Sequence, residues 1–87
     1  MDAESVRERV RALIAAGTLP CEPEDRVWAG RGTGDTCAAC VQPIDRTEIE
    51  FEVDLPSGRT LRLHRQCHRI WLEECEPEID AGASPHR

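Results

Sequence analysis

Cys37-Ala38-Ala39-Cys40 and His64-Arg65-Gln66-Cys67 are the two stretches of sequence that decide the fold. Each stretch places two metal-binding side chains three positions apart, a spacing at which one short turn brings both onto a common centre. Thiolate and imidazole donors suit zinc, and a closed set of four leaves no open position for chemistry. The sequence therefore predicts one structural Zn²⁺ ion. Its predicted ligands are Cys37, Cys40, His64 and Cys67.

Other side chains compete for this role. A redox dithiol at Cys37 and Cys40 is the alternative, but it is typical of βαβ chains and leaves the second pair unexplained. On a helix His68 diverges from Cys67 by about 100°, so only one of the two can face the ion. Cys75 lies roughly 12 Å further along the helix axis and is expected to be a buried core thiol. Cys21 stays open as a free thiol, a buried thiol or a redox partner for Cys75.

The composition explains why a chain of this length needs an ion. The 87 residues suffice for one small domain, and chains of this size are marginal without a staple. Aromatic residues make up only 3%, namely Trp28, Phe51 and Trp71, so few large side chains can fill a core. A structural zinc contributes on the order of 10 kcal/mol to the folding of small metal domains.

Charge and cysteine content lead us to expect a soluble protein of the bacterial cytoplasm. All 11 cationic side chains are Arg, which we interpret as the codon bias of a GC-rich bacterial genome. No apolar run approaches the ~20 residues of a membrane span, and we expect no signal peptide. An odd cysteine count, 5, fits metal ligands in a reducing compartment better than a disulfide framework. The net charge of -6 argues against binding to an anionic membrane and disfavours nucleic acid.

The N-terminal part divides into a helix and an arm. Residues 1–20 are predicted to contain an amphipathic helix, because Val6 and Val10 begin an apolar stripe that Leu13 and Ile14 continue. Asp2 is its expected N-cap and Gly17 follows its end. Residues 21–36, rich in Pro, Glu, Gly and Asp, are expected to form an irregular arm. Trp28 is interpreted as the anchor of this arm on the core, whereas an exposed Trp28 would be a candidate binding hot spot.

A β-hairpin is predicted between the two ligand pairs. Apolar and acidic residues alternate from Glu48 to Leu55, and Leu61 and Leu63 alternate on the return strand. A turn at 56–58, with Gly58 in a left-handed conformation, is the length that pairs apolar residues across the strands. The same register sets Glu50 opposite His64.

Two further expectations follow from this register and from the residues after it. Zinc-bound histidines donate their second ring N–H to a carboxylate, carbonyl or water, so Glu50 is our candidate partner of His64, with a solvated acidic face as the alternative. From Arg65 a helix is predicted that buries Cys67, Ile70, Trp71 and Cys75 and ends at Pro77. The zinc finger thus spans 37–76, and 77–87 is expected to be a disordered tail.

A knuckle, a hairpin and a helix whose first turn supplies the second ligand pair resemble the treble-clef class of zinc fingers. The spacing Cys37-x2-Cys40 with His64-x2-Cys67 is similar to the first zinc half of a LIM domain. The run Cys37-x-x-Cys40-x-x-Pro43-Ile44 resembles the zinc fingers of bacterial regulators that bind RNA polymerase. A LIM domain continues into a second zinc half and those regulators carry a long coiled coil, whereas this chain has neither. The resemblance implies a small α+β metal-stabilised domain, a treble-clef-like zinc finger with an added N-terminal helix, and the same four ligands.

Three functions are compatible with such a domain. A closed metal site, an acidic balance and small size favour a non-enzymatic module that binds another protein, of undetermined oligomeric state. Nucleic-acid binding is the alternative. Its candidate basic surface is formed by Arg59, Arg62, Arg65 and Arg69. A thiol redox sensor that releases zinc on oxidation is the second alternative. Catalysis is not expected, because no Ser/His/Asp arrangement is readable and a full zinc shell has no vacancy.

Overall fold

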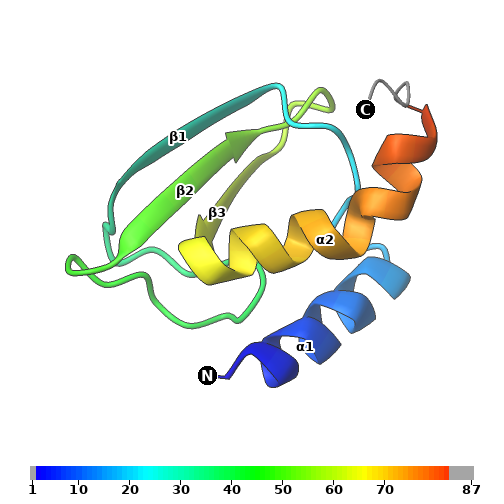
Figure 1. Ribbon diagram of the computed structural model, residues 1–87. Helices are drawn as coiled ribbons and strands as arrows, with labels where there is room; N and C mark the ends of the chain where they lie inside the picture. The colour runs from blue at the N-terminus through cyan, green and yellow to red at the C-terminus, as the bar shows by residue number, and fades with distance from the viewer. Residues whose placement is uncertain (1, 83–87) are drawn as a thin grey trace.

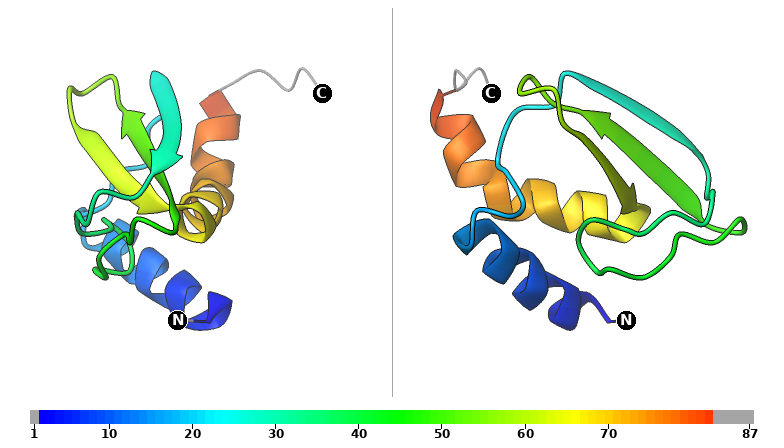
Figure 2. Two further views of the ribbon diagram at one scale, coloured as in Figure 1. Left: turned by 90° about the vertical axis from the view of Figure 1, so that its left-hand side faces the viewer. Right: turned by 180° about the vertical axis from the view of Figure 1, so that it is seen from behind.

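A computed structural model describes residues 2–82 of the chain, with side chains through Glu76. The elements in chain order are α1 (Ala3–Ala15), β1 (Arg26–Arg31), β2 (Ile49–Asp54), β3 (Thr60–His64) and α2 (Arg65–Gly82). The strands form one antiparallel sheet in the order β1-β2-β3. Helix α2 lies between this sheet and α1 (Figure 1, Figure 2). The predicted α+β class is therefore confirmed.

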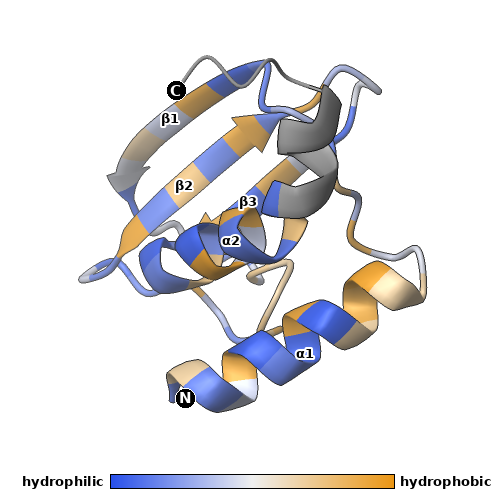
Figure 3. Ribbon diagram, turned by 45° about the vertical axis from the view of Figure 1, so that its right-hand side comes forward, coloured by the Kyte–Doolittle hydropathy of each residue, from blue (hydrophilic) through white to orange (hydrophobic). Residues whose placement is uncertain are grey.

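Helix α1 begins and ends where its sequence signals place it. The Asp2 carboxylate accepts a hydrogen bond from Ser5 N at 3.2 Å, and Gly17 leaves the helix with φ 78°. The predicted stripe is buried at Val6 and Val10, and Figure 3 shows its apolar segments alternating with hydrophilic ones along α1. This stripe is the surface that packs against α2.

The β2–β3 hairpin has the predicted register. Val53 pairs with Leu61 and Phe51 pairs with Leu63. Gly58 has φ 96°, the left-handed conformation that this turn requires and that glycine adopts without strain. The turn thus sets the apolar side chains of both strands on the face that packs against α2.

The buried core joins the hairpin, α2 and α1. Trp71 is the only aromatic side chain buried in the described part of the chain, and its Nε1 donates to Pro20 O at 2.8 Å. This bond holds the segment after α1 against α2. The apolar residues buried with Trp71 include Val6, Val10, Leu19, Ile44, Val53, Leu55, Leu61, Leu63 and Ile70.

The prediction that residues 21–36 form an irregular arm is wrong for residues 26–31, which form strand β1. Residues 26–31 pair with β2 along the whole length of the strand, for example Val27 with Val53. Every residue of β1 is exposed, so the strand lacks the apolar alternation by which strands are recognised. Trp28 does not anchor the arm on the core, because it is 48% exposed and lies under the guanidinium of Arg26.

The sequence predicted that α2 ends at Pro77, and this prediction is wrong. The helix continues to Gly82, so the first part of the predicted tail is helical, and residues 83–87 lie outside the described part. A proline inside a helix removes one backbone hydrogen bond and bends the axis. Figure 1 shows such a change of direction between the yellow first half of α2 and its orange second half.

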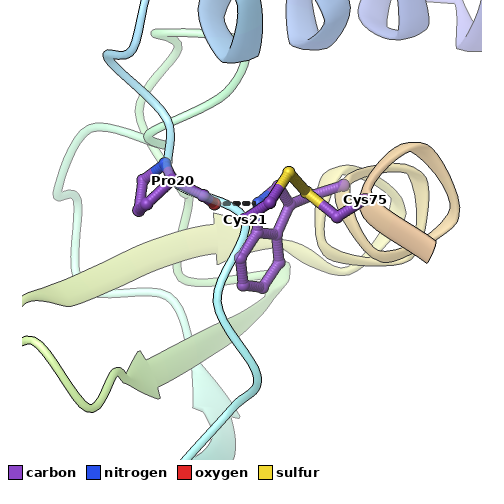
Figure 4. Close-up of a disulfide and its surroundings, with 4 residues drawn as sticks. Pro20, Cys21 and Cys75 are labelled. Atoms are coloured by element: carbon purple, nitrogen blue, oxygen red, sulfur yellow. Dashed lines mark hydrogen bonds between the residues drawn. A yellow bond between two sulfur atoms is a disulfide. The ribbon is translucent and has the colours of Figure 1, made fainter. Parts of the chain in front are cut away.

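Cys21 and Cys75 form a disulfide, with their Cα atoms 5.4 Å apart. Of the alternatives left open for Cys21, this is the redox pairing, and it corrects the expectation of a free core thiol at Cys75. Figure 4 shows the bridge beside the Pro20 segment, joining it to α2. Covalent and hydrogen-bonded links therefore fix the same segment to the same helix.

We expect the Cys21→Ser/Cys75→Ser double variant to lose about 4 kcal/mol of unfolding free energy, because the bridge closes a sequence separation of 54 residues. Urea unfolding followed by circular dichroism measures this loss. Serine variants are preferable to reductants, since thiol reductants also compete for metal. Bound zinc per chain, the control, should stay unchanged, and an unaltered unfolding midpoint would contradict the expectation.

Candidate metal centre

The structure brings the predicted ligands together. Their donor atoms all lie within 4.8 Å of one another, so the cluster is positioned to hold one metal ion. In a tetrahedral zinc site with Zn–S bonds of about 2.3 Å, sulfur atoms are about 3.8 Å apart. The three cysteines of the cluster are buried. The set is Cys37, Cys40, His64 and Cys67.

A tight turn aims the first ligand pair at this centre. Val41 N donates to Cys37 O at 3.0 Å, and Cys37 N donates to Gln42 O at 2.9 Å, so the chain reverses within the knuckle. Val41 has φ 64°, a left-handed conformation that is strained for a β-branched residue. The backbone strain is located at the residue that follows the second cysteine ligand.

A backbone hydrogen bond ties the knuckle to the hairpin. Ala38 N donates to Arg62 O at 2.8 Å, on the outer edge of β3. His64 is the last residue of β3, and Cys67 lies in the first turn of α2. The edge that holds the knuckle therefore also delivers the second ligand pair, and the helix N-terminus favours the negative charge of a thiolate there.

The imidazole of His64 is oriented for metal binding through Nδ1. This atom lies 3.3 Å from Cys40 Sγ and 4.0 Å from Cys67 Sγ. On the other side of the ring, Nε2 lies 3.2 Å from Pro43 O and 3.3 Å from a carboxylate oxygen of Glu48. A proton on Nε2 donates to Pro43 O, with the Glu48 carboxylate close beside it, and leaves the Nδ1 lone pair for an ion.

Glu50 is not the partner of His64, although the two residues pair across the strands as predicted. Its carboxylate accepts hydrogen bonds from Thr33 N at 3.1 Å and from an Arg62 guanidinium nitrogen at 2.8 Å. Burial alone would raise the pKa of Glu50. The bonds from Thr33 and Arg62 lower the pKa by more than burial raises it, so the net shift is downward. Glu50 therefore matches neither prediction. It does not bond to His64, and at 5% exposed it does not belong to a solvated acidic face. The prediction missed Glu48 because it precedes the strand and reaches the ring from the loop.

The pKa values of the three thiols shift in different directions, so Cys37 carries negative charge most readily. A hydrogen bond from the Cys67 thiol lowers the pKa of Cys37 to about 4. The same hydrogen bond, together with burial, raises the pKa of Cys67. Burial also raises the pKa of Cys40. For His64, burial lowers the pKa, but the contacts with Cys37, Glu48 and the Pro43 carbonyl together raise it by more. A divalent cation compensates the mutual repulsion of the thiolates, which is why such a cluster suits a metal.

An open cavity of about 900 Å³ reaches the metal centre. Val6 of α1, the 42–49 loop and the first turn of α2 contribute to its walls, together with Cys40, His64 and Cys67. A metal site needs an entry path, and this cavity provides one.

The remaining candidates lie away from the centre. His68 stacks on the ring of Phe51 with centroids 4.5 Å apart, and its Nε2 contacts Glu24. Arg62 pairs with Glu50, Glu52 and Asp35.

The other members of the predicted basic surface do not join Arg62 in a single patch. Arg59 donates to Thr18 O at the opposite end of β3 from the metal centre, whereas Arg65 and Arg69 are exposed on α2. The charge of Arg62 is balanced by carboxylates, and Arg59 lies apart from Arg65 and Arg69. The four arginines therefore do not form the continuous basic surface that the sequence predicted.

Comparisons with protein families, with characterised proteins and with solved structures found no match to this chain. The treble-clef and LIM resemblances therefore stay predictions. The geometry supports a Cys3His metal centre in a small α+β domain.

We expect Glu48→Gln to weaken zinc binding about tenfold, because its carboxylate lies 3.3 Å from His64 Nε2 and stabilises the proton that this atom donates to Pro43 O. Competition with a coloured chelator measures the affinity. Glu50→Gln is the matched control, since its carboxylate contacts Thr33 and Arg62 instead. Equal losses in both variants would contradict the assignment.

Val41→Gly should raise the unfolding free energy by about 1 kcal/mol, because glycine adopts a left-handed conformation without strain. Val27→Gly is the control in an extended strand, where glycine is unfavourable, and it should be destabilising. Chemical unfolding of the zinc-loaded proteins distinguishes them. Destabilisation by both substitutions would show that Val41 is not strained.

Proposed function

We propose that the protein binds one zinc ion with a structural role and acts as a non-enzymatic module that binds another protein. The observation that carries this proposal is the donor set itself, because three sulfurs and one imidazole within 4.8 Å complete a tetrahedral shell from the protein alone. Catalytic zinc sites keep one position for water or substrate. A complete shell leaves the ion to stabilise the fold.

The neighbouring carboxylates support a non-catalytic role. Glu48 accepts from Asp45 N at 2.8 Å and lies beside His64, and Glu50 is held by Thr33 and Arg62. Both are engaged in positioning loops around the centre. A general base needs a carboxylate free to reach a proton, and these bonds oppose that role.

The location of the protein stays a prediction. Among the described residues, no helix is long and apolar enough to cross a membrane. The Cys21–Cys75 disulfide counts against a reducing cytoplasm, because disulfides persist mainly in oxidising compartments. The zinc centre does not share a cysteine with this bridge, so the proposed function holds in either compartment.

Cobalt substitution tests whether the shell is complete. We expect the Co²⁺-loaded protein to show a tetrahedral thiolate spectrum that does not change when azide is added, because azide needs an open position. His64→Gly, which removes one donor, is the control whose cobalt spectrum should respond to azide. A response from the unaltered protein would reveal an exchangeable position and contradict a purely structural role.

A further inference from the structure

Strand β1 forms a free edge of the sheet. The opposite edge is covered, because Ala38 N bonds to Arg62 O on β3 and the knuckle lies there. In the strand order β1-β2-β3 no described strand lies beyond β1, as Figure 1 shows. Native proteins usually protect such an edge, since its backbone groups invite another strand.

The hydrogen-bond pattern shows which backbone groups of β1 are unpaired. Gly32 N donates to Glu48 O at 2.9 Å, and in this register even-numbered residues of β1 bond with β2. The N–H and C=O groups of the alternate residues then point away from β2. Those residues are Val27, Ala29 and Arg31.

Along β1, apolar side chains lie between a positive charge at each end, with Arg26 and Trp28 on one face of the strand and Val27 and Arg31 on the other. Trp28 is 48% exposed and Val27 is 39% exposed, between Arg26 and Arg31. Figure 3 shows β1 beginning with a hydrophilic band, followed by hydrophobic bands that a paler one separates. In the described part of the chain neither arginine has an ion pair, and Asp54, opposite Arg26, instead accepts from Thr60 Oγ1.

These features fit an extended acidic peptide better than other occupants. A second copy paired antiparallel about Ala29 through its outward backbone groups would set Arg31 opposite Val27, so it would place no carboxylate directly opposite this arginine. Single-stranded nucleic acid has no backbone N–H ladder to match this edge.

We propose that β1 binds an extended segment of another protein by adding it as a strand, with acidic residues at positions i and i+5 around apolar ones. The five-residue interval matches the separation of Arg26 and Arg31 in either strand direction. Trp28 supplies the large contact surface typical of a binding hot spot. This inference rests on the proposed function, since it names the partner class of the same module.

The probe is a fluorescent hexapeptide, Glu-Val-Val-Thr-Val-Glu, compared by anisotropy with Lys-Val-Val-Thr-Val-Lys. We expect the zinc-loaded protein to bind the acidic peptide at least about tenfold more tightly. Ala29→Pro removes one outward N–H without removing a bond to β2, so it should weaken binding about tenfold. Ala29→Val is the matched control, because it keeps the N–H and should bind as the parent does.

The double variant Arg26→Glu/Arg31→Glu gives a second test that leaves the backbone unchanged. It should invert the preference, so that the basic peptide binds more tightly. Zinc content and circular dichroism of each variant show whether the module itself is intact, which separates failure of this inference from failure of the proposed function.

Four results would overturn the inference. The first two are equal or undetectable binding of both peptides, and unchanged binding by a folded Ala29→Pro protein. The third is sedimentation showing a dimer of the parent that Ala29→Pro dissociates, which would identify a second copy as the occupant. The fourth is tighter binding of a single-stranded thymidine oligonucleotide than of the acidic peptide.

Discussion

Three buried cysteine sulfurs and one imidazole, held within 4.8 Å of one another, are the constraint on which the rest of the structure depends. Buried thiolates repel one another, and burying unpaired charge is costly. A divalent cation turns this repulsion into attraction. An ion bound there would also fasten the knuckle, the end of β3 and the start of α2 at a single point. The hydrogen bond from Ala38 N to Arg62 O already holds the knuckle against β3.

The surrounding fold is consistent with a centre that supplements a thin core. Trp71 is the one buried aromatic side chain in the described residues, and the hairpin contributes mainly leucine and valine. In the middle of α2 the Cys21–Cys75 bridge and the Trp71–Pro20 hydrogen bond fasten the segment after α1. The long helix is thus held at its first turn by the ligand cluster and further along by a disulfide, while the sheet edge at β1 stays open.

Local patterns in the sequence predicted the parts of the fold that depend on local physics. Helix α1 has an N-cap and an apolar stripe, and the hairpin register follows from apolar pairing around Gly58. The ligand set follows from spacing alone. Strand β1 was missed because all its residues are exposed, so its pairing depends on β2 and leaves no periodic signal. The role of Glu48 and the Cys21–Cys75 pairing depend on which loops meet in space, which spacing does not reveal.

At Pro77 a local rule predicted a helix end that the structure does not have. A proline normally ends a helix, yet α2 continues past it and changes direction. Trp28 is a comparable case, because a large aromatic residue is usually buried and here lies on the surface of an edge strand. Both departures occur outside the metal centre, where the ligand spacing does not constrain the chain.

The account is tested most directly by far-UV circular dichroism during removal of the ion, with the disulfide intact and bound zinc counted by native mass spectrometry. We predict one zinc per chain and a loss of ordered structure that follows the loss of zinc. A chain that is isolated without metal and keeps its native spectrum would contradict the account.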